Sequence, residues 1–206
     1  MKRFYIIASA VTSVAAIIAL IVCIICCLSK KTYTYEVYRH GLELDYYAAK
    51  DSLMHMLDDY IYSVAPNSIM NGVAFIDEYE EYGVDLLFAV TQCQIESRFA
   101  TKGLGGKTNS AFNVKAYDGK ADKYMDNYSH PDMSIAPYMK LIVKQYLVNG
   151  KTEADLMDNF VNSEGKRYAS DPNYERKFVS IYNSLDSGKV GDAYQHYLKY
   201  KLLAEM

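Results

Sequence analysis

The sequence has no tryptophan and only four cysteines in its 206 residues. Three of these, Cys23, Cys26 and Cys27, lie in an apolar run near the N-terminus, and Cys93 alone is left for the rest of the chain. A disulfide within that remainder is therefore excluded, and packing must provide its stability. No histidine near Cys93 in the sequence marks it as a nucleophile, so we interpret it as a core thiol.

A strongly basic surface is also missing, because the chain carries 22 lysines and arginines against 25 aspartates and glutamates. This balance argues against a sequence-independent nucleic-acid binder, and we expect no nucleic-acid partner. The histidines are scattered and form no His-Glu-x-x-His motif, so the sequence predicts neither a metal site nor a cofactor. They are His40, His55, His130 and His196.

Tyrosine is abundant in the chain, which contains 21 of these residues. A tyrosine combines a flat apolar face with a hydroxyl group, which suits stacking on sugar rings and hydrogen bonding to them. The alternative is that these tyrosines fill the core where tryptophan and phenylalanine would otherwise lie. The sequence leaves both roles open.

The stretch from Phe4 to Leu28 contains no charged residue. At ~1.5 Å per residue a helix over this run is about 37 Å long, enough to cross a hydrocarbon core of ~30 Å. No small-x-small cleavage pattern follows it, so we predict an uncleaved, single-pass transmembrane signal anchor over residues 1–31. Basic residues stand on both sides of the run, and the positive-inside rule therefore gives no clear orientation.

Residues 32–68 are predicted to form a helical stalk. Four apolar residues fall on one face of this helix, and the run Ala65-Pro66-Asn67-Ser68 ends it. The stalk either packs on the domain that follows or holds that domain away from the membrane. The four apolar residues are Leu53, Leu57, Ile61 and Val64.

The most apolar stretch of the remaining chain runs from Tyr82 to Phe99. It has no proline, and no glycine after Gly83, so the pattern predicts a helix buried on most sides. The glycine-rich residues 103–106 then end it.

This buried helix ends on an acid, Glu96. Burial disfavours the charged form and raises the pKa of a carboxyl group, by up to about 3–5 units when desolvation is complete. A carboxylic acid that stays protonated near neutral pH can donate a proton to a leaving oxygen. The alternative interpretation is that Glu96 caps a loop or pairs with Arg98 in solvent.

The second half of the chain combines a polar loop region with further helices. Residues 100–132 have loop or short-strand character, and Asp118-Gly119 is typical of a turn. Helices are predicted from Pro137 to about Val148 and from Thr152 to about Val161. Another begins at Asp171-Pro172 and ends at Ser187-Gly188.

Three segments resemble motifs of known enzymes. The sequence Tyr-Gly-Val-Asp-Leu-Leu-Phe-Ala-Val at 82–90, followed by Glu96-Ser97, resembles the signature helix of lysozyme-like murein enzymes, including lytic transglycosylases. Residues 109–116 are similar to the Asn-Leu-Phe-Gly-Ile-Lys segment of bacterial endo-N-acetylglucosaminidases. Residues 168–174 are similar to the Tyr-Ala-x-Asp-Pro-x-Tyr motif of the same enzymes. Together the resemblance covers about residues 69–185.

The resemblance implies a mainly α, lysozyme-like α+β domain at residues 69–187, with a small hairpin lobe and a glycan groove between the lobes. Residues 188–206 would follow as a C-terminal helix or tail. Glu96 takes the general-acid position. Tyr168 takes the position of a groove tyrosine that supports the reacting sugar, although it could instead be a packing residue at a helix start. The expected groove-lining residues are Phe112, Asn113, Tyr117, Tyr124 and Tyr128.

Many glucosaminidases of this kind use a second glutamate in the hairpin lobe, but here no Glu occurs between Glu96 and Glu153. An inverting hydrolase needs a second carboxylate about 6.5–9.5 Å from the acid, and a retaining one needs it at about 5–5.5 Å. Among the aspartates of the lobe we select Asp122 or Asp118 for this role. Alternatively, the acetamido oxygen of the substrate attacks the anomeric carbon, and Glu96 is the sole protein acid/base.

The sequence thus predicts a membrane-anchored peptidoglycan hydrolase that cleaves β-1,4-glycosidic bonds on the extracytoplasmic side. Its expected partners are glycan strands and the membrane. One alternative is a lytic transglycosylase, although the Gly-Leu-Met-Gln-like segment of many transglycosylases is missing. A second is a non-catalytic, glycan-binding component of an envelope-spanning or phage apparatus, which the missing lobe glutamate favours.

Overall fold

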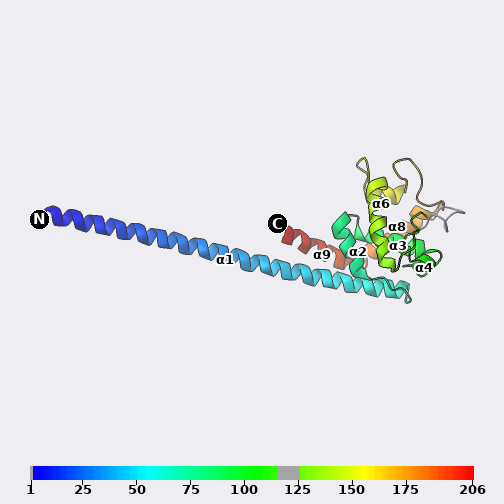
Figure 1. Ribbon diagram of the computed structural model, residues 1–206, viewed down its shortest axis with the longest axis horizontal. Helices are drawn as coiled ribbons and strands as arrows, with labels where there is room; N and C mark the ends of the chain where they lie inside the picture. Colours follow the sequence, from blue (N-terminus) through cyan, green and yellow to red (C-terminus); the bar gives the residue numbers. More distant parts are fainter. Residues whose placement is uncertain (1, 116–125) are drawn as a thin grey trace. The chain divides into compact units, whose positions relative to one another are not determined.

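The computed structural model describes the backbone of residues 2–115 and 126–206. Side chains are described from Leu20 onward, except at 23, 30–35, 37 and 116–125. The chain divides into two compact units, one of residues 1–47 with 200–206 and the other of residues 48–199. The helices of the second unit, which include α2, α3, α6 and α8, are labelled in Figure 1.

Helix α1 (Lys2–Val64) is the longest element and contributes residues to both units. In the first unit the described leucine, isoleucine and valine residues between Leu20 and Leu28 are exposed. Within the described part of the chain, no helix combines the length and the apolar character that crossing a membrane requires. Most side chains of the predicted anchor, residues 1–31, lie outside that part.

In the second unit, the end of α1 packs on the domain, as the first of the two stalk alternatives expected. Leu53, Leu57 and Ile61 are at most 2 % exposed. Helix α2 (Gly72–Tyr82) crosses them so closely that a Cβ on Gly72 would lie 2.6 Å from Cβ of Leu57. Nζ of Lys50 joins the two helices through ion pairs with Asp77 (3.0 Å) and Glu80 (2.8 Å) on α2.

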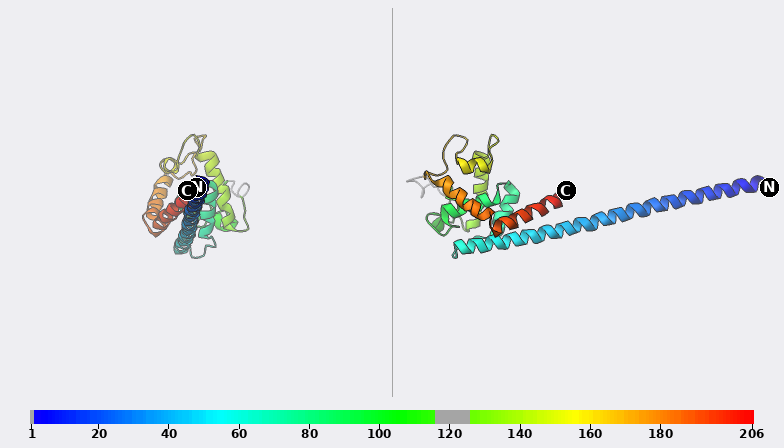
Figure 2. Two further views of the ribbon diagram at one scale, coloured as in Figure 1. Left: turned by 90° about the vertical axis from the view of Figure 1, so that its left-hand side faces the viewer. Right: turned by 180° about the vertical axis from the view of Figure 1, so that it is seen from behind.

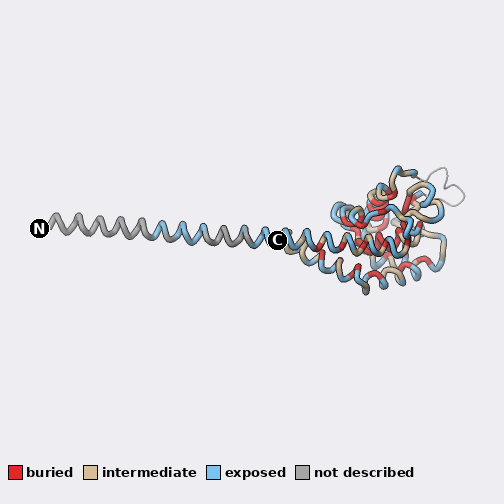
Figure 3. The backbone as a smooth tube through the Cα atoms, turned by 90° about the horizontal axis from the view of Figure 1, so that it is seen from below, coloured by how far each residue is buried: buried red, intermediate tan, exposed pale blue. Residues whose placement is uncertain are grey.

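Helix α3 (Leu86–Ser97) is the buried centre of this unit and lies within the predicted stretch. Residues 86–93 are all buried, and α3 packs against α2 and α8. Gly83 ends α2 in the left-handed conformation (φ 71°), and the side chain of Asp85 then caps α3 by accepting the N–H of Phe88 at 2.8 Å. Figure 3 shows the buried residues gathered in this part of the chain.

The remaining helices surround α3, and Figure 2 shows α6 and α8 on opposite sides of the unit. The predicted helix from Thr152 is confirmed, with a capping box between Thr152 and Asp155, but it ends at Asp158. The extended backbone of Asn159 and a bridge between Val161 and Arg167 prevent its continuation. The elements are α4 (Gly105–Thr108), η1 (Pro131–Ser134), α6 (Ile135–Leu141), the π-helical η2 (Ile142–Tyr146), α7 (Glu153–Asp158), α8 (Tyr174–Asp186) and α9 (Lys189–Glu205).

The mainly helical fold class is confirmed. The described residues contain no strand of the predicted hairpin lobe, and their only β-type pairing is the single bridge between Val161 and Arg167. Within the region 100–132, for which loop or short-strand character is predicted, the described residues 111–112 and 114–115 lie in turns. Positive φ angles at Asn113 (50°) and Lys115 (66°) interrupt any extended run there. Residues 116–125 of the predicted hairpin lobe lie outside the described part.

Candidate active site

Glu96 lies in the last turn of α3, partly buried, and each of its carboxylate oxygens accepts a hydrogen bond. The hydroxyl of Tyr174 donates to Oε1 at 2.6 Å. The amide Nδ2 of Asn113 donates to Oε2 at 3.2 Å and to the backbone carbonyl of Glu96 at 2.7 Å. Arg98 instead donates from Nε to the carbonyl of Val64 at 2.7 Å, at the end of α1. The arrangement therefore differs from the exposed ion pair that formed the alternative interpretation.

The environment raises the pKa of Glu96 above its ordinary value. Burial is the largest cause, because it disfavours the charged form. The hydrogen bonds from Tyr174 and Asn113 stabilise the carboxylate and act in the opposite direction, but they do not cancel the effect of burial. The result is an acid that holds its proton to a higher pH than an exposed glutamate.

Ser97, the second residue of the Glu-Ser pair, fixes the end of α3 to the loop that follows. Its hydroxyl donates to the carbonyl of Ala111 at 2.6 Å and accepts the N–H of Ala100 at 2.8 Å. A Cβ on Gly105 would come within 2.5 Å of Cβ of Ser97, so only glycine fits where the two segments meet. These contacts place the loop that carries Asn113 against the acid.

The chain leaves α3 through three consecutive residues in the left-handed conformation. Arg98, Phe99 and Ala100 have φ angles of 51°, 55° and 57°. Each non-glycine residue in this region costs of order 1 kcal/mol, so surrounding contacts must impose the turn. Full burial of Phe99, with its ring edge-on to Phe75, provides such contacts.

Asn113, predicted to line the groove, directly contacts the acid. Its φ of 50° is one that asparagine tolerates better than most residues. Both side-chain hydrogen bonds of Asn113 come from Nδ2, while its buried Oδ1 has no partner among the described residues. The neighbouring Phe112 is fully buried and stacks on Tyr138, with ring centroids 3.9 Å apart and planes 5° from parallel. Phe112 therefore supports the loop from the core.

Tyr168, the predicted groove tyrosine, bonds to the same loop. Its hydroxyl donates to the carbonyl of Phe112 at 2.9 Å, and its ring stacks on Phe160 at 4.9 Å. Burial raises its pKa well above the ordinary value. The ring of Tyr174 lies 6.1 Å away, and this second tyrosine of the motif is the one that reaches Glu96.

Two residues of the site carried no predicted role. Tyr174 was visible as the last residue of the Tyr-Ala-Ser-Asp-Pro-Asn-Tyr segment. Gln92 lies one turn before Glu96 and is fully buried, and its Oε1 accepts a hydrogen bond from Tyr138 at 2.5 Å. An amide inside an otherwise apolar run was the signal that could have identified it.

Both candidates for the second carboxylate, Asp118 and Asp122, lie outside the described residues, as do Tyr117 and Tyr124. Tyr128 is partly buried, and its N–H donates to the carbonyl of Thr108 at 2.9 Å. In the described ranges 20–115 and 126–206, no group of three or more histidine, cysteine or acidic side chains could hold a metal ion.

Cys93 is fully buried, and burial raises the pKa of its thiol, which suits a core residue. It lies three residues before Glu96 on the same helix. Its Sγ is 3.6 Å from Sδ of Met70. The interpretation as a core thiol agrees with these surroundings.

Comparison with known proteins places this site within a family. No curated protein matches the chain. The glucosaminidase family, described as mannosyl-glycoprotein endo-beta-N-acetylglucosaminidase, matches residues 72–187, which is more than half of the chain and includes both Glu96 and Tyr174. Membership supports the activity of a glycoside hydrolase. The chain thus belongs to the glucosaminidase family of lysozyme-like enzymes.

Proposed function

We propose that this protein is a peptidoglycan hydrolase that cleaves a β-1,4-glycosidic bond of the glycan strand, with Glu96 as the general acid. The observation that carries the proposal is the partly buried carboxyl group of Glu96, whose pKa is raised while Tyr174 and Asn113 hold both its oxygens. A general acid must be protonated at the working pH and fixed within reach of the leaving oxygen. The raised pKa of Glu96 and the hydrogen bonds that hold its carboxyl group support this role in a chain of the glucosaminidase family.

The two hydrogen bonds give the two oxygens of Glu96 different roles. The short bond from Tyr174 fixes Oε1, whereas Asn113 makes a longer contact with Oε2. Oε2 is therefore the oxygen that carries the proton and passes it to the glycosidic oxygen.

The group that attacks the anomeric carbon is the second part of the proposal. Attack by the acetamido oxygen of the substrate needs no second protein carboxylate, and Glu96 would then serve first as acid and then as base. Asp122 or Asp118 remains the alternative if the lobe provides a second carboxylate.

Digestion of purified sacculi by the full-length chain tests the proposal. We expect soluble muropeptides with free reducing ends from the wild type and none from Glu96→Gln. Glu164→Gln is the matched control, because it alters an exposed glutamate that pairs with Lys166 on a loop. If the products are anhydromuropeptides and their release depends on Glu96, the protein is a lytic transglycosylase and not a hydrolase. If wild type and Glu96→Gln bind sacculi equally and neither releases muropeptides, the protein is a non-catalytic, glycan-binding component.

We also propose that residues 1–31 anchor the protein in a membrane, with the domain on the extracytoplasmic side. The support is the uncharged run from Phe4 to Leu28, together with exposed apolar side chains at its described positions. Such side chains are costly in water and stable in lipid. Alkaline carbonate should leave the protein in the membrane fraction, and external protease should digest the domain in intact spheroplasts. Release by carbonate, or complete protection from protease, would refute this location.

A further inference from the structure

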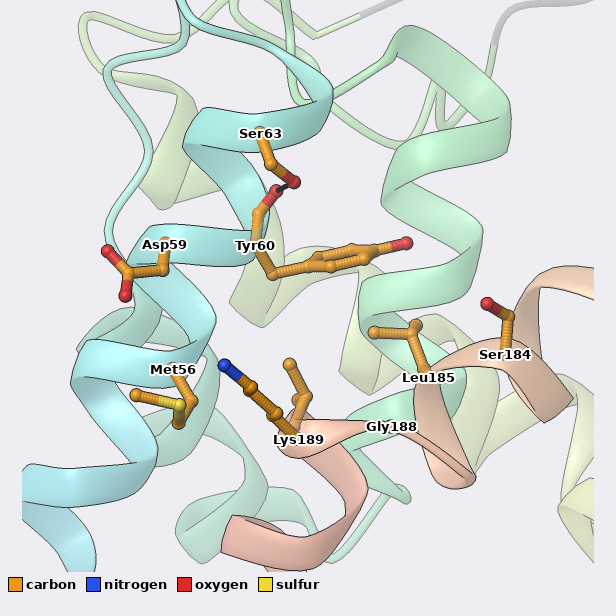
Figure 4. A pocket seen from close by; sticks show the side chains of 9 residues that line it. Met56, Asp59, Tyr60, Ser63, Ser184, Leu185, Gly188 and Lys189 are labelled. Atoms are coloured by element: carbon orange, nitrogen blue, oxygen red, sulfur yellow. Dashed lines mark hydrogen bonds between the residues drawn. The ribbon is translucent and has the colours of Figure 1, made fainter.

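A pocket of about 290 Å³ lies in the second unit, between the last turns of α1 and the junction of α8 with α9. Figure 4 shows Tyr60 and Met56 of α1 facing Leu185 of α8 and Lys189, the first residue of α9. The volume is just below the range of about 300–1,000 Å³ for small-molecule sites, so the pocket suits a ligand of two or three small groups.

The aromatic wall of the pocket is held rigidly. The hydroxyl of Tyr60 donates to Oε1 of Gln94 on α3, and its ring lies edge-on to Phe99, with centroids 6.2 Å apart. The hydroxyl of Ser63 donates to the carbonyl of Tyr60 at 2.7 Å. A ligand would therefore meet a preformed surface and would lose little free energy in ordering it.

The pocket lining carries one cationic residue, Lys189, and one anionic residue, Asp59, which point in different directions. In Figure 4 the ammonium group of Lys189 points into the space below the Tyr60 ring, while the carboxylate of Asp59 points away from it. Lys189 is exposed at the pocket wall and forms no ion pair with any of the described residues. The positive end of the α9 dipole has the same sign, so an anionic group is favoured at this place.

The remaining wall combines apolar side chains with a hydroxyl group. Leu185 is 2 % exposed and Val190 is 6 % exposed, and both border the pocket with Met56. In Figure 4, Ser184 stands beside Leu185 at the edge of the pocket, where its hydroxyl can reach a peptide group. We propose that the pocket binds the free carboxyl end of a short peptide with small apolar side chains. Lys189 pairs with the carboxylate, and Met56, Leu185 and Val190 enclose the side chain.

The pocket is separate from the site at Glu96. Gln94, which holds Tyr60, points about 200° around the helix from Glu96, because successive residues turn by about 100°. The group that binds in this pocket is therefore not the glycosidic bond that Glu96 would cleave. In murein, the stem peptides carry such carboxyl ends. That source of the ligand rests on the proposed function, whereas the binding site itself does not.

Methyl NMR of the full-length chain in detergent, with ¹³C-labelled methionine, tests the site. Titration with N-acetyl-D-alanyl-D-alanine should shift the Met56 resonance, which a Met56→Leu variant identifies. The C-terminal amide of the same dipeptide should bind at least tenfold more weakly, because it lacks the charge. Lys189→Gln should weaken binding of the acid at least tenfold, whereas Asp59→Asn, on the neighbouring wall, should not weaken it.

Equal affinity for acid and amide, no effect of Lys189→Gln, or an unmoved Met56 resonance would overturn the proposal. N-acetyl-L-alanyl-L-alanine tests the source of the peptide. Tighter binding of the D-peptide supports murein, and tighter binding of the L-peptide overturns murein as the source. The result is independent of the proposed catalysis, because Glu96→Gln should abolish release from sacculi and leave the Met56 titration unchanged.

Discussion

The two ends of helix α3 each carry a carboxyl group beside a tyrosine, and they differ in how these groups are satisfied. At the start, Asp85 accepts the N–H of Phe88 at 2.8 Å and the hydroxyl of Tyr194 at 3.3 Å. At the end, Glu96 accepts one hydroxyl and one side-chain amide. Burial raises the pKa of both acids.

The difference lies in which form of the acid the helix favours. Asp85 stands where unpaired N–H groups and the positive end of the helix dipole stabilise a carboxylate. Glu96 stands at the opposite end, where the dipole disfavours negative charge and where no backbone N–H of the described residues binds the carboxylate. One carboxyl group is therefore suited to capping the helix, and the other to releasing a proton.

Replacing Glu96 should have the largest effect on activity. Glu96→Gln keeps the size of the side chain but removes the proton donor, so we expect release of muropeptides to fall by about 10²–10⁴-fold, the usual contribution of a general acid. Thermal unfolding should show a protein that is at least as stable as the wild type, because a partly buried acid has been removed. Retained activity would show that the chemical difference between the two ends of α3 is not catalytic.

Replacing Asp85 should lower stability and leave activity nearly unchanged. Asp85→Ala removes the cap of α3, which typically costs about 1–2 kcal/mol of unfolding free energy. Activity per folded molecule should stay close to wild type, since Glu96 lies about 16 Å away along the helix. Asp85→Asn is the matched control, because asparagine also caps helices and should recover most of the loss. Urea unfolding together with the sacculus assay measures both quantities.

The sequence alone predicted the buried helix and the acid at its end, because a long apolar run that stops at Glu96 is a local pattern. It also predicted the cap at Thr152, which depends on neighbouring residues. It did not assign Tyr174, which is 78 positions from Glu96 and meets it only after α8 packs on α3. Gln92 was missed for a similar reason, since its partner Tyr138 comes from α6. Contacts between distant segments carry no local signal.

Removing the hydroxyl of Tyr174 tests how Glu96 is tuned. This hydroxyl stabilises the carboxylate, so Tyr174→Phe should raise the pKa of Glu96 further. A general acid works only when protonated, and the falling limb of the pH–activity profile should therefore move to higher pH. Tyr168→Phe is the control: its hydroxyl binds the carbonyl of Phe112, so it should lower stability by about 1 kcal/mol and leave the limb in place. If Tyr168→Phe moves the falling limb and Tyr174→Phe does not, then Tyr168 and not Tyr174 is the residue that tunes the pKa of Glu96.

The smallest effect should appear in the pH dependence of stability. The folded-state pKa of Glu96 lies above its unfolded value, so folding favours the protonated form. The contribution of Glu96 to stability is thus complete below the unfolded pKa and is lost as the pH rises through the folded pKa. Glu96→Gln should remove this loss. The unfolding free energy of the variant should therefore increase relative to that of the wild type as the pH rises from the unfolded to the folded pKa of Glu96. Urea titrations at several pH values measure the difference. Parallel curves for the two proteins would mean that Glu96 ionises as freely as an exposed acid, and the contrast with Asp85 would then rest on capping alone.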